Sequence, residues 1–300
     1  MSPTTSRPLV GIGVPVYNGE RYLADALEAL ISQTYPELDI VVCDNASTDA
    51  SVEIAQEFAR RDPRVRVVVN PENIGAARNY RRSFELSRGD YFRWATADDL
   101  SAPEYVERCM DVLLERPDVV QAYPRTRLID AQGNAIEDYD DGLHAVAERP
   151  SARYRQVTRR LRLVNALYGV IRSDALRRTA MLGTYIGSDM PLMAEIALYG
   201  KIWEVPEILF FRRMHASAQS AQDVLGQQRH YNPRATRAFS FRHWRHLAER
   251  QRAVLRSPIS LGEKLATCGF LLRDSIRTRD EFARELKEGL RIWSAGRRAE

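Results

Sequence analysis

Short apolar runs alternate with amphipathic stretches along the first hundred residues. Runs rich in β-branched residues predict strands at 9–16, 39–43, 65–69 and 91–95. Between them, apolar side chains recur at the spacing of one helix face over 22–33, 51–61 and 76–87. Strands that alternate with helices in this way form crossover units and a mostly parallel sheet. The pattern therefore predicts an α/β fold.

The pattern is weaker after residue 100. We expect helices at 103–115, 173–181 and 190–199, and strands at 119–123, at 126–129 and before His215. Residues 138–160 are polar and poorly patterned, which favours a flexible loop. Three further helices are expected at 234–255, 259–277 and 279–294. The change in composition near Pro233 predicts a domain over 1–232 and a helical extension over 233–300.

The composition is that of an ordinary soluble protein, with 44% hydrophobic and 28% charged residues. No apolar run reaches the roughly 18 residues of a membrane span, and residues 1–9 lack the apolar stretch of a signal peptide. Cys43, Cys109 and Cys268 lie far apart, so neither a disulfide framework nor a cysteine-rich zinc site is supported. We expect a reducing, cytoplasmic setting.

The formal net charge of +4 is unevenly distributed. Residues 233–300 hold 16 of the 44 basic and 8 of the 40 acidic residues, a net charge of +8 that leaves −4 for residues 1–232. A basic amphipathic segment either packs on the core, associates with a second copy to form a homodimer, or docks on an anionic membrane surface. All three remain open at this point, and we expect no nucleic-acid partner.

Polar residues follow each of the first four predicted strands. The four sets are Tyr17 to Glu20, Asp44 to Asp49, Asn70 to Gly75, and Thr96 to Asp99. Turns and helix caps use the same residue types, so one such loop alone means little. Four loops at the carboxyl edge of a parallel sheet predict a ligand site. The adjacent carboxylates of Asp98 and Asp99 repel each other unless a cation or basic group lies there.

Several common nucleotide-binding and catalytic motifs are missing. There is no GxxxxGK[ST] and no GxSxG, and Gly11-Ile12-Gly13 is not followed by the third glycine of a dinucleotide fingerprint. A nucleotidyltransferase would need a glycine-rich loop with Lys or Arg after the first strand, which VPVYNGERYL does not supply.

Five motifs follow one another in the chain. They are VPVYNGERYL (14–23), SQTYPELDIVVCDNASTDAS (32–51), NPENIGAARNY (70–80), RGDYFRWATADDLSAPEYVE (88–107) and GSDMPLMAEIALYGKIWEVPEILFFRRMHASAQS (187–220). This series resembles glycosyltransferase family 2, the inverting enzymes of the GT-A fold. The resemblance implies a Rossmann-like, mostly parallel central sheet flanked by helices. It also implies transfer of a sugar from a nucleotide sugar, with a divalent metal.

The resemblance assigns roles to the matching positions. It implies a nucleotide site formed by Pro15, Tyr17, Asn18, Asp44, Asn73, Arg78 and Asp98. Asp44 would accept the imide N–H of uracil or thymine while Tyr17 stacks on the ring, which favours UDP or dTDP; GDP stays open. Asp99 and His215 would bind Mg²⁺ or Mn²⁺, although a lone histidine is more often structural. Ala97 stands where the family often has a third acidic residue.

Asp189 matches the family's catalytic base, with Ser188 in place of the usual preceding acid. Taken alone, Asp189 is better explained as a helix N-cap. The dipole of the following helix predicts that its carboxylate stays ionised at neutral pH, ready to accept a proton. The aspartates to consider if Asp189 is not the base are Asp138, Asp140 and Asp141.

The chain is thus expected to be a metal-dependent inverting glycosyltransferase. It would act by single displacement on a glycan or a lipid-linked acceptor, in the synthesis of cell-envelope polysaccharide. Residues 1–100 would bind the nucleotide, and 101–232 the acceptor. We expect it in the cytoplasm, peripheral at the inner face of the membrane. The alternative is an inactive sugar-nucleotide-binding partner protein, against which Asp98, Asp99 and Asp189 argue.

Overall fold

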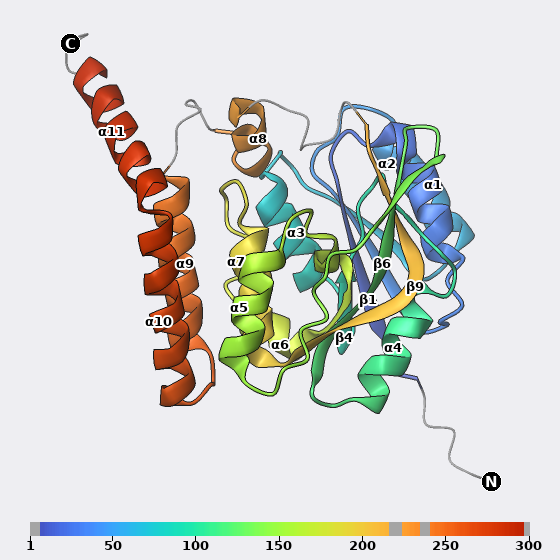
Figure 1. The fold of residues 1–300 in the computed structure, drawn as a ribbon. Helices are drawn as coiled ribbons and strands as arrows, with labels where there is room; N and C mark the ends of the chain where they lie inside the picture. Colours follow the sequence, from blue (N-terminus) through green and yellow to red (C-terminus); the bar gives the residue numbers. More distant parts are fainter. Residues whose placement is uncertain (1–6, 216–223, 235–240, 297–300) are drawn as a thin grey trace.

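The computed structural model describes residues 7–215, 224–234 and 241–296. A central sheet carries helices on its faces, and three C-terminal helices stand together at one side of the molecule (Figure 1). The strands of these residues are β1 (Val10–Val16), β2 (Leu38–Asp44), β3 (Val65–Val69), β4 (Tyr91–Trp94), β5 (Leu100–Ser101), β6 (Val119–Ile129), β7 (Ala135–Tyr139), β8 (Val170–Arg172) and β9 (Lys201–Arg213). Their order in the sheet is β3-β2-β1-β4-β8-β6-β9-β5, with β7 paired to β6.

The helices of the first two hundred residues are α1 (Glu20–Ile31), α2 (Ser51–Arg61), α3 (Ala76–Glu85), α4 (Tyr105–Glu115), α5 (Pro150–Arg160), α6 (Ser173–Arg177) and α7 (Asp189–Tyr199). Those that follow are α8 (Val224–Tyr231), α9 (Arg242–Arg256), α10 (Leu261–Arg277) and α11 (Arg279–Gly296).

The first half of the sheet is parallel, as its alternating pattern predicts. β3, β2, β1 and β4 are parallel neighbours, and their strand ends pair in register, with Val16 opposite Asp44 and Asp44 opposite Val69. All four predicted strands and all three predicted helices of this half are present within two residues of their expected bounds. The polar loops that follow the strands therefore lie along one edge of the sheet.

The second half of the sheet is mixed. β8 pairs antiparallel with β4 and β6, while β6 runs parallel to β9. The two-residue strand β5 pairs antiparallel with the end of β9, with Leu100 opposite Phe211 and Ser101 opposite Phe210. This pairing places the segment that follows β4 beside the end of β9, more than a hundred residues later in the chain.

Two predictions for the second half are wrong. Residues 119–129 form one strand, not two, because Pro124 is accommodated at a shift in the β6–β9 register. The expected loop over 138–160 contains the end of β7 and the whole of α5. The buried face of α5 includes Arg153, whose guanidinium donates to the carbonyls of Ala147, Glu148 and Ala197 at 2.8–2.9 Å. Because an arginine takes a buried position, the helical spacing of apolar residues in α5 is interrupted and is not recognised in the sequence.

Other predicted bounds shift. The helix expected from 103 begins at Tyr105, and the helix expected to end at 181 ends at Arg177. α8 was not expected at all. The helix predicted from 234 begins at Arg242, and residues 235–240 lie outside those described. α10 and α11 match their predicted ranges to within two residues.

The C-terminal helices pack on the rest of the chain. α9 contacts α7 and α10 contacts α5 (Figure 1), and Val254, Phe270 and Leu271 are buried in the same apolar core as residues of β4 and α7. A charged contact adds to this, because Arg256 of α9 binds Glu195 of α7 through two hydrogen bonds of 2.5 and 2.9 Å. Within the described ranges, no helix combines the length and apolar character needed to cross a membrane.

Replacing Arg256 by Met should destabilise the protein by about 2 kcal/mol. Glu195 is only 2% exposed, so its carboxylate would be left buried without its partner. The cost falls below the roughly 3–5 kcal/mol of a fully buried pair because Arg256 itself is partly exposed. Urea unfolding measures the change. Arg252→Met, which breaks the exposed pair with Glu249 on the same helix, is the control and should cost under ~1 kcal/mol. Equal stability of the two variants would show that the pair does not anchor α9.

Candidate functional site

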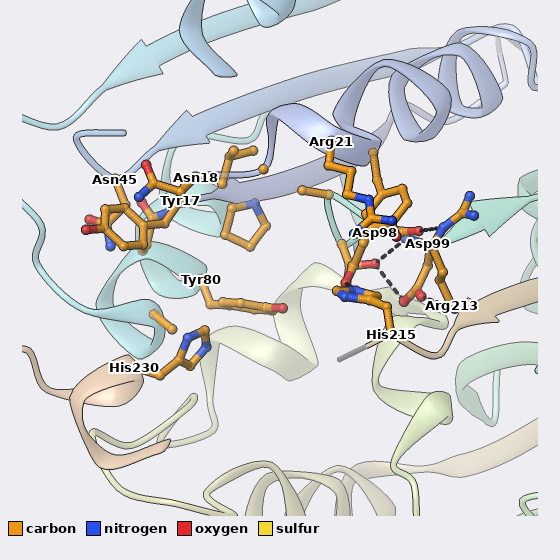
Figure 2. Close-up of a pocket in the computed structure, with 18 of the residues that line it drawn as sticks. Tyr17, Asn18, Arg21, Asn45, Tyr80, Asp98, Asp99, Arg213, His215 and His230 are labelled. Atoms are coloured by element: carbon orange, nitrogen blue, oxygen red, sulfur yellow. Dashed lines mark hydrogen bonds and ion pairs between the residues drawn. The ribbon is translucent and has the colours of Figure 1, made fainter. Parts of the chain in front are cut away.

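A cavity of about 700 Å³ opens at the carboxyl edge of the parallel strands (Figure 2). It is lined by residues that follow β1, β2, β3 and β4, by the end of β9, and by α3 and α8. Seven of the predicted site residues line it: Pro15, Tyr17, Asn18, Asn73, Asp98, Asp99 and His215. Asp44, Arg78 and Asp189 are not among its lining residues.

The acidic end of the cavity is built by the β5–β9 pairing. One carboxylate oxygen of Asp99 accepts a hydrogen bond from the backbone N–H of Arg213 at 2.8 Å, and the other accepts from the Thr96 hydroxyl at 2.7 Å. The Asp98 carboxylate lies 2.9 Å from Nε2 of His215. The two carboxyls and the imidazole, predicted from distant motifs, are thus brought together (Figure 2).

The two arginines before Met214 differ in their contacts. The Arg213 guanidinium donates to the backbone carbonyls of Asp98 and Ala131 at 2.9 and 3.1 Å, and its side chain is 3% exposed. Arg212 donates to the Leu163 carbonyl and to the Asn165 side chain while lining the cavity. Arg213 therefore holds the acidic loop in place, and Arg212 supplies positive charge at the cavity wall.

At this end of the cavity, the ionised forms of Asp98 and Asp99 are unfavourable side by side. Burial and the neighbouring charge of Asp98 raise the pKa of Asp99 to about 7. The hydrogen bonds from Thr96 and from the Arg213 N–H act in the opposite direction, as does the charge of Arg212. The raised pKa means that Asp99 would gain from additional positive charge.

The opposite end of the cavity carries aromatic and amide groups. The Tyr17 side chain is half exposed, which leaves its ring available for stacking. Asn45 donates from its side-chain amide to Asn73 at 2.9 Å and accepts from the backbone N–H of Ile74 at 3.0 Å. Asn18 accepts from the Thr48 N–H at 2.9 Å, which ties the loops after β1 and β2 together. Asn45 was not predicted, although it follows Asp44 directly.

Asp44 lies behind this end of the cavity, not in its wall. The residue is 1% exposed, and one carboxylate oxygen accepts from the Ser47 N–H at 2.9 Å. The other oxygen has no hydrogen-bond partner among the described residues. Asp44 therefore shapes the loop that presents Asn45, and its contact with a base stays a prediction.

Arg78 borders a smaller cavity of about 100 Å³, together with Asn73, Tyr231 and Pro233. This places Arg78 beside α8, outside the main cavity. Its part in the nucleotide site stays a prediction.

Four aromatic residues of the cavity were missed as site residues: Tyr22, Tyr80, Tyr168 and His230. Tyr80 lies between the amide end and the acidic end, and His230 points in from α8 (Figure 2). Gly75 allows α8 to come this close: its φ is +84°, and a Cβ there would lie 2.5 Å from the Tyr231 carbonyl oxygen. Tyr80 has the spacing of a core residue on α3, so its pattern gave no sign of this role.

Asp189 is the first residue of α7, and Ser188 occupies the N-cap position. One of its carboxylate oxygens accepts from the N–H of Met190 at 3.0 Å. Burial raises the pKa of Asp189, while Arg212 and Arg242 lower it. The helix N-terminus was expected to favour the ionised form, but burial has the larger effect and the opposite sign. Arg212, in the cavity wall, acts on both places, because its charge lowers the pKa of Asp189 and that of Asp99.

The three alternative aspartates do not line the cavity. Asp138 is exposed and pairs with Arg127 across the β6–β7 hairpin at 2.6 Å. Asp140 is exposed and accepts from the Gly142 N–H. Asp141 is 6% exposed, and burial raises its pKa to about 6. Of the three, only Asp141 has the environment of a proton acceptor.

In open α/β sheets ligands bind outside the carboxyl ends of the strands, which is where this cavity opens. The family described as glycosyl transferase family 2 matches residues 12–178, more than half of the chain. The chain belongs to this family.

Curated relatives match over different shares of their length. Chondroitin synthase of Escherichia coli is 35% identical over 132 residues, which are 44% of this chain and 19% of that protein. An uncharacterized glycosyltransferase of Haemophilus influenzae is 31% identical over 130 residues, or 52% of its length. An uncharacterized glycosyltransferase of Rickettsia typhi is 28% identical over 242 residues, 77% of this chain and 71% of that protein. The matched residues thus span about a fifth of the first relative and about half of the second.

Solved structures confirm the GT-A fold. Residues 1–349 of S. aureus TarS, in complex with UDP-GlcNAc, superpose with a TM-score of 0.64 at 15% identity over 89% of this chain and 72% of that one. A mannosyltransferase of Pyrobaculum calidifontis, in complex with GDP-Man and Mn²⁺, gives 0.53 at 17% identity over 94% and 85%. Identities this low establish the fold alone.

Proposed function

We propose that the protein is a metal-dependent inverting glycosyltransferase that uses a nucleoside diphosphate sugar. The observation that carries this proposal is one cavity with stacking and amide groups at one end and Asp98, Asp99 and His215 at the other. Its volume of about 700 Å³ falls within the range of small-molecule sites. The acceptor is proposed to be a hydroxyl of a glycan or lipid-linked saccharide.

The amide end would hold the base and the acidic end the diphosphate. Tyr17 would stack on the base, and Asn45 and Asn73 offer amide groups beside it. The second oxygen of Asp44 keeps its capacity to accept an imide N–H, which supports UDP or dTDP as the donor nucleotide. The neighbours were solved with UDP-GlcNAc and with GDP-Man, so the fold itself accepts either class of base.

The metal-ligating side chains fit a divalent cation whose coordination shell is completed by oxygens of the substrate. Among the described residues, no three acidic, histidine or cysteine side chains are arranged as a full metal site. Mg²⁺ is typically held by one or two carboxylates and by substrate phosphates, and an added imidazole is compatible with Mn²⁺. We propose that Asp99 and His215 are the protein ligands. A bound metal ion would stabilise negative charge on the diphosphate leaving group.

Asp189 is proposed to take the proton of the acceptor hydroxyl. A single displacement with one base inverts the anomeric carbon. A carboxylate whose pKa is raised by burial is a stronger base than an exposed one. Asp189 is not among the residues that line the donor cavity, but the charge of Arg212, which does line it, acts on the Asp189 carboxyl.

Asp99→Asn should abolish the metal dependence of donor binding. The amide keeps the size of the carboxyl but is a weaker ligand for a hard cation. A thermal-shift panel of nucleoside diphosphates and nucleotide sugars, with and without Mn²⁺, ranks the donors for the wild type and then tests the variant. Asp111→Asn, in an exposed carboxylate of α4, is the control. If Asp99→Asn still binds UDP more tightly with Mn²⁺ than without it, Asp99 is not a ligand.

Asp189→Asn should lower the transfer rate by roughly 10²–10⁴-fold while leaving donor affinity unchanged. Asn preserves the size of the side chain at the start of α7 but does not act as a base. Release of the nucleoside diphosphate, with an acceptor or with water, measures turnover, and calorimetry measures donor affinity. Turnover near that of the wild type would refute the assignment and direct attention to Asp141.

The helical extension is proposed to dock on an anionic membrane at the cytoplasmic face. Leu261, Leu265, Leu272 and Ile276 lie on one face of α10 and are 56–73% exposed, and Leu286 and Leu290 of α11 are also exposed. This apolar stripe belongs to the segment with a net charge of +8. Apolar side chains beside arginines are the features by which a helix binds the surface of anionic lipid.

The protein should bind vesicles of phosphatidylglycerol and phosphatidylcholine, and binding should weaken as salt screens the arginines. It should bind phosphatidylcholine alone much less. The double variant Leu265→Asp/Leu272→Asp should lose binding, while Leu114→Asp on α4, also exposed, should not. Equal binding to both vesicle types, or none to either, contradicts the proposal. A dimer that the double variant dissociates would instead identify a second copy as the partner.

A further inference from the structure

We propose that α9 positions the base: His246 fixes the loop that precedes Asp189, and Arg242 places a positive charge beside its carboxyl. Both are positioning residues, since neither lines the donor cavity. The inference rests on the proposed role of Asp189. It gives the C-terminal extension a part in the reaction, separate from any role in docking.

The loop before α7 lies directly against α9. Gly187 has a φ of +77°, in the left-handed region that favours glycine. A Cβ at this position would lie 3.0 Å from Cε1 of His246 and 3.2 Å from Nη2 of Arg242. The chain therefore passes over these two side chains just two residues before Asp189.

His246 fixes this loop through its backbone. The residue is 8% exposed, and its Nε2 lies 3.1 Å from the carbonyl oxygen of Ile186. Burial lowers the pKa of His246 to about 4, so the ring is neutral at pH 7. Only the tautomer protonated at Nε2 donates to that carbonyl. The ring also packs against Tyr185, with centroids 5.6 Å apart.

Arg242 is a cation whose charge acts on Asp189. The charges of Arg212, on β9, and of Arg242, on α9, both lower the pKa of Asp189 that burial raises. Tyr185 is the other titratable group nearby, and the charge of Asp189 contributes to its raised pKa. Arg212 also acts on Asp99 and Asp141. Arg242 therefore provides a way to change the charge near Asp189 without touching the donor cavity.

The position of Arg242 is itself held from two directions. The neighbouring His243 contacts Glu281 and Glu285 of α11, at 2.7 Å from each ring nitrogen. At the other end of α9, Arg256 binds Glu195 of α7. α9 is thus held to α11 near its start and to α7, the helix that begins with Asp189, at its end.

The pH profile of turnover tests Arg242. The base acts when ionised, and removing the cation makes ionisation harder. Arg242→Gln should therefore shift the acid limb of the kcat profile to higher pH, and Arg242→Lys should keep it near that of the wild type. Arg252→Gln, which removes the same charge from an exposed position on α9, should leave the profile unchanged. A general loss of folding would lower turnover at every pH instead of moving the limb.

The split between turnover and donor binding tests His246. His246→Leu removes the donor to Ile186 and should lower kcat about tenfold to a hundredfold, the scale expected when a catalytic group is misplaced by about 1 Å. Affinity for UDP should stay within about twofold, since the donor cavity is elsewhere. His246→Gln, which keeps an N–H donor, should recover part of the loss; it also serves if the Leu variant does not fold.

The outcomes separate this inference from the proposed function. If Asp189→Asn retains turnover, the assignment of the base fails, and this inference fails with it. If Asp189→Asn is inactive but Arg242→Gln has the wild-type pH profile, only the inference about Arg242 is refuted. Equal loss of turnover and UDP affinity in both His246 variants would reduce His246 to a structural residue.

Discussion

The site depends on two residue pairs between β5 and β9. Leu100 lies opposite Phe211, and this contact turns the backbone N–H of Arg213 toward the Asp99 carboxylate. The same contact brings His215 to Asp98. Two acidic side chains are thereby held together in a partly buried place, where their repulsion is offset only in part by hydrogen bonds. The strand pairing maintains this unfavourable arrangement, and a positive charge placed beside the two carboxylates would stabilise it.

Local patterns in the sequence predict the parallel half of the fold and the edge where its loops meet. The spacing of apolar residues and the positions of the predicted strands place Tyr17, Asn73 and Asp98 on that edge. In the structure all three line one cavity. The β5–β9 pairing spans more than a hundred residues and has no local signature. α5 escapes prediction because Arg153 occupies its buried face, where backbone carbonyls satisfy the guanidinium. Tyr80 looks like a core residue because its helix packs on the sheet.

Asp189 shows how a correct local rule gives the wrong sign. A carboxylate at a helix N-terminus is stabilised by the backbone dipole, an effect of up to about 2 kcal/mol. Burial acts on the same group in the opposite direction and has the larger effect on its pKa. A helix over 234–255 was expected from the sequence, but the contact of α9 with Gly187 has no local signature. The effect of the helix N-terminus on the pKa of Asp189 is thus set against that of burial, while α9, which lies more than fifty residues away in the chain, contributes the charge of Arg242.

The C-terminal extension differs from a simple tail in having two opposite faces with different contacts. Inward, Val254 and Phe270 join the main core, and Arg256 satisfies the buried Glu195. Outward, Leu265 and Leu272 are covered by nothing in the described part of the chain. The inward face of the extension is fixed to α7, the helix that begins with the candidate base Asp189. A surface that binds the outward face therefore binds helices that are packed against α7. The segment that sets the basic charge of the chain is therefore also one that shapes the environment of Asp189.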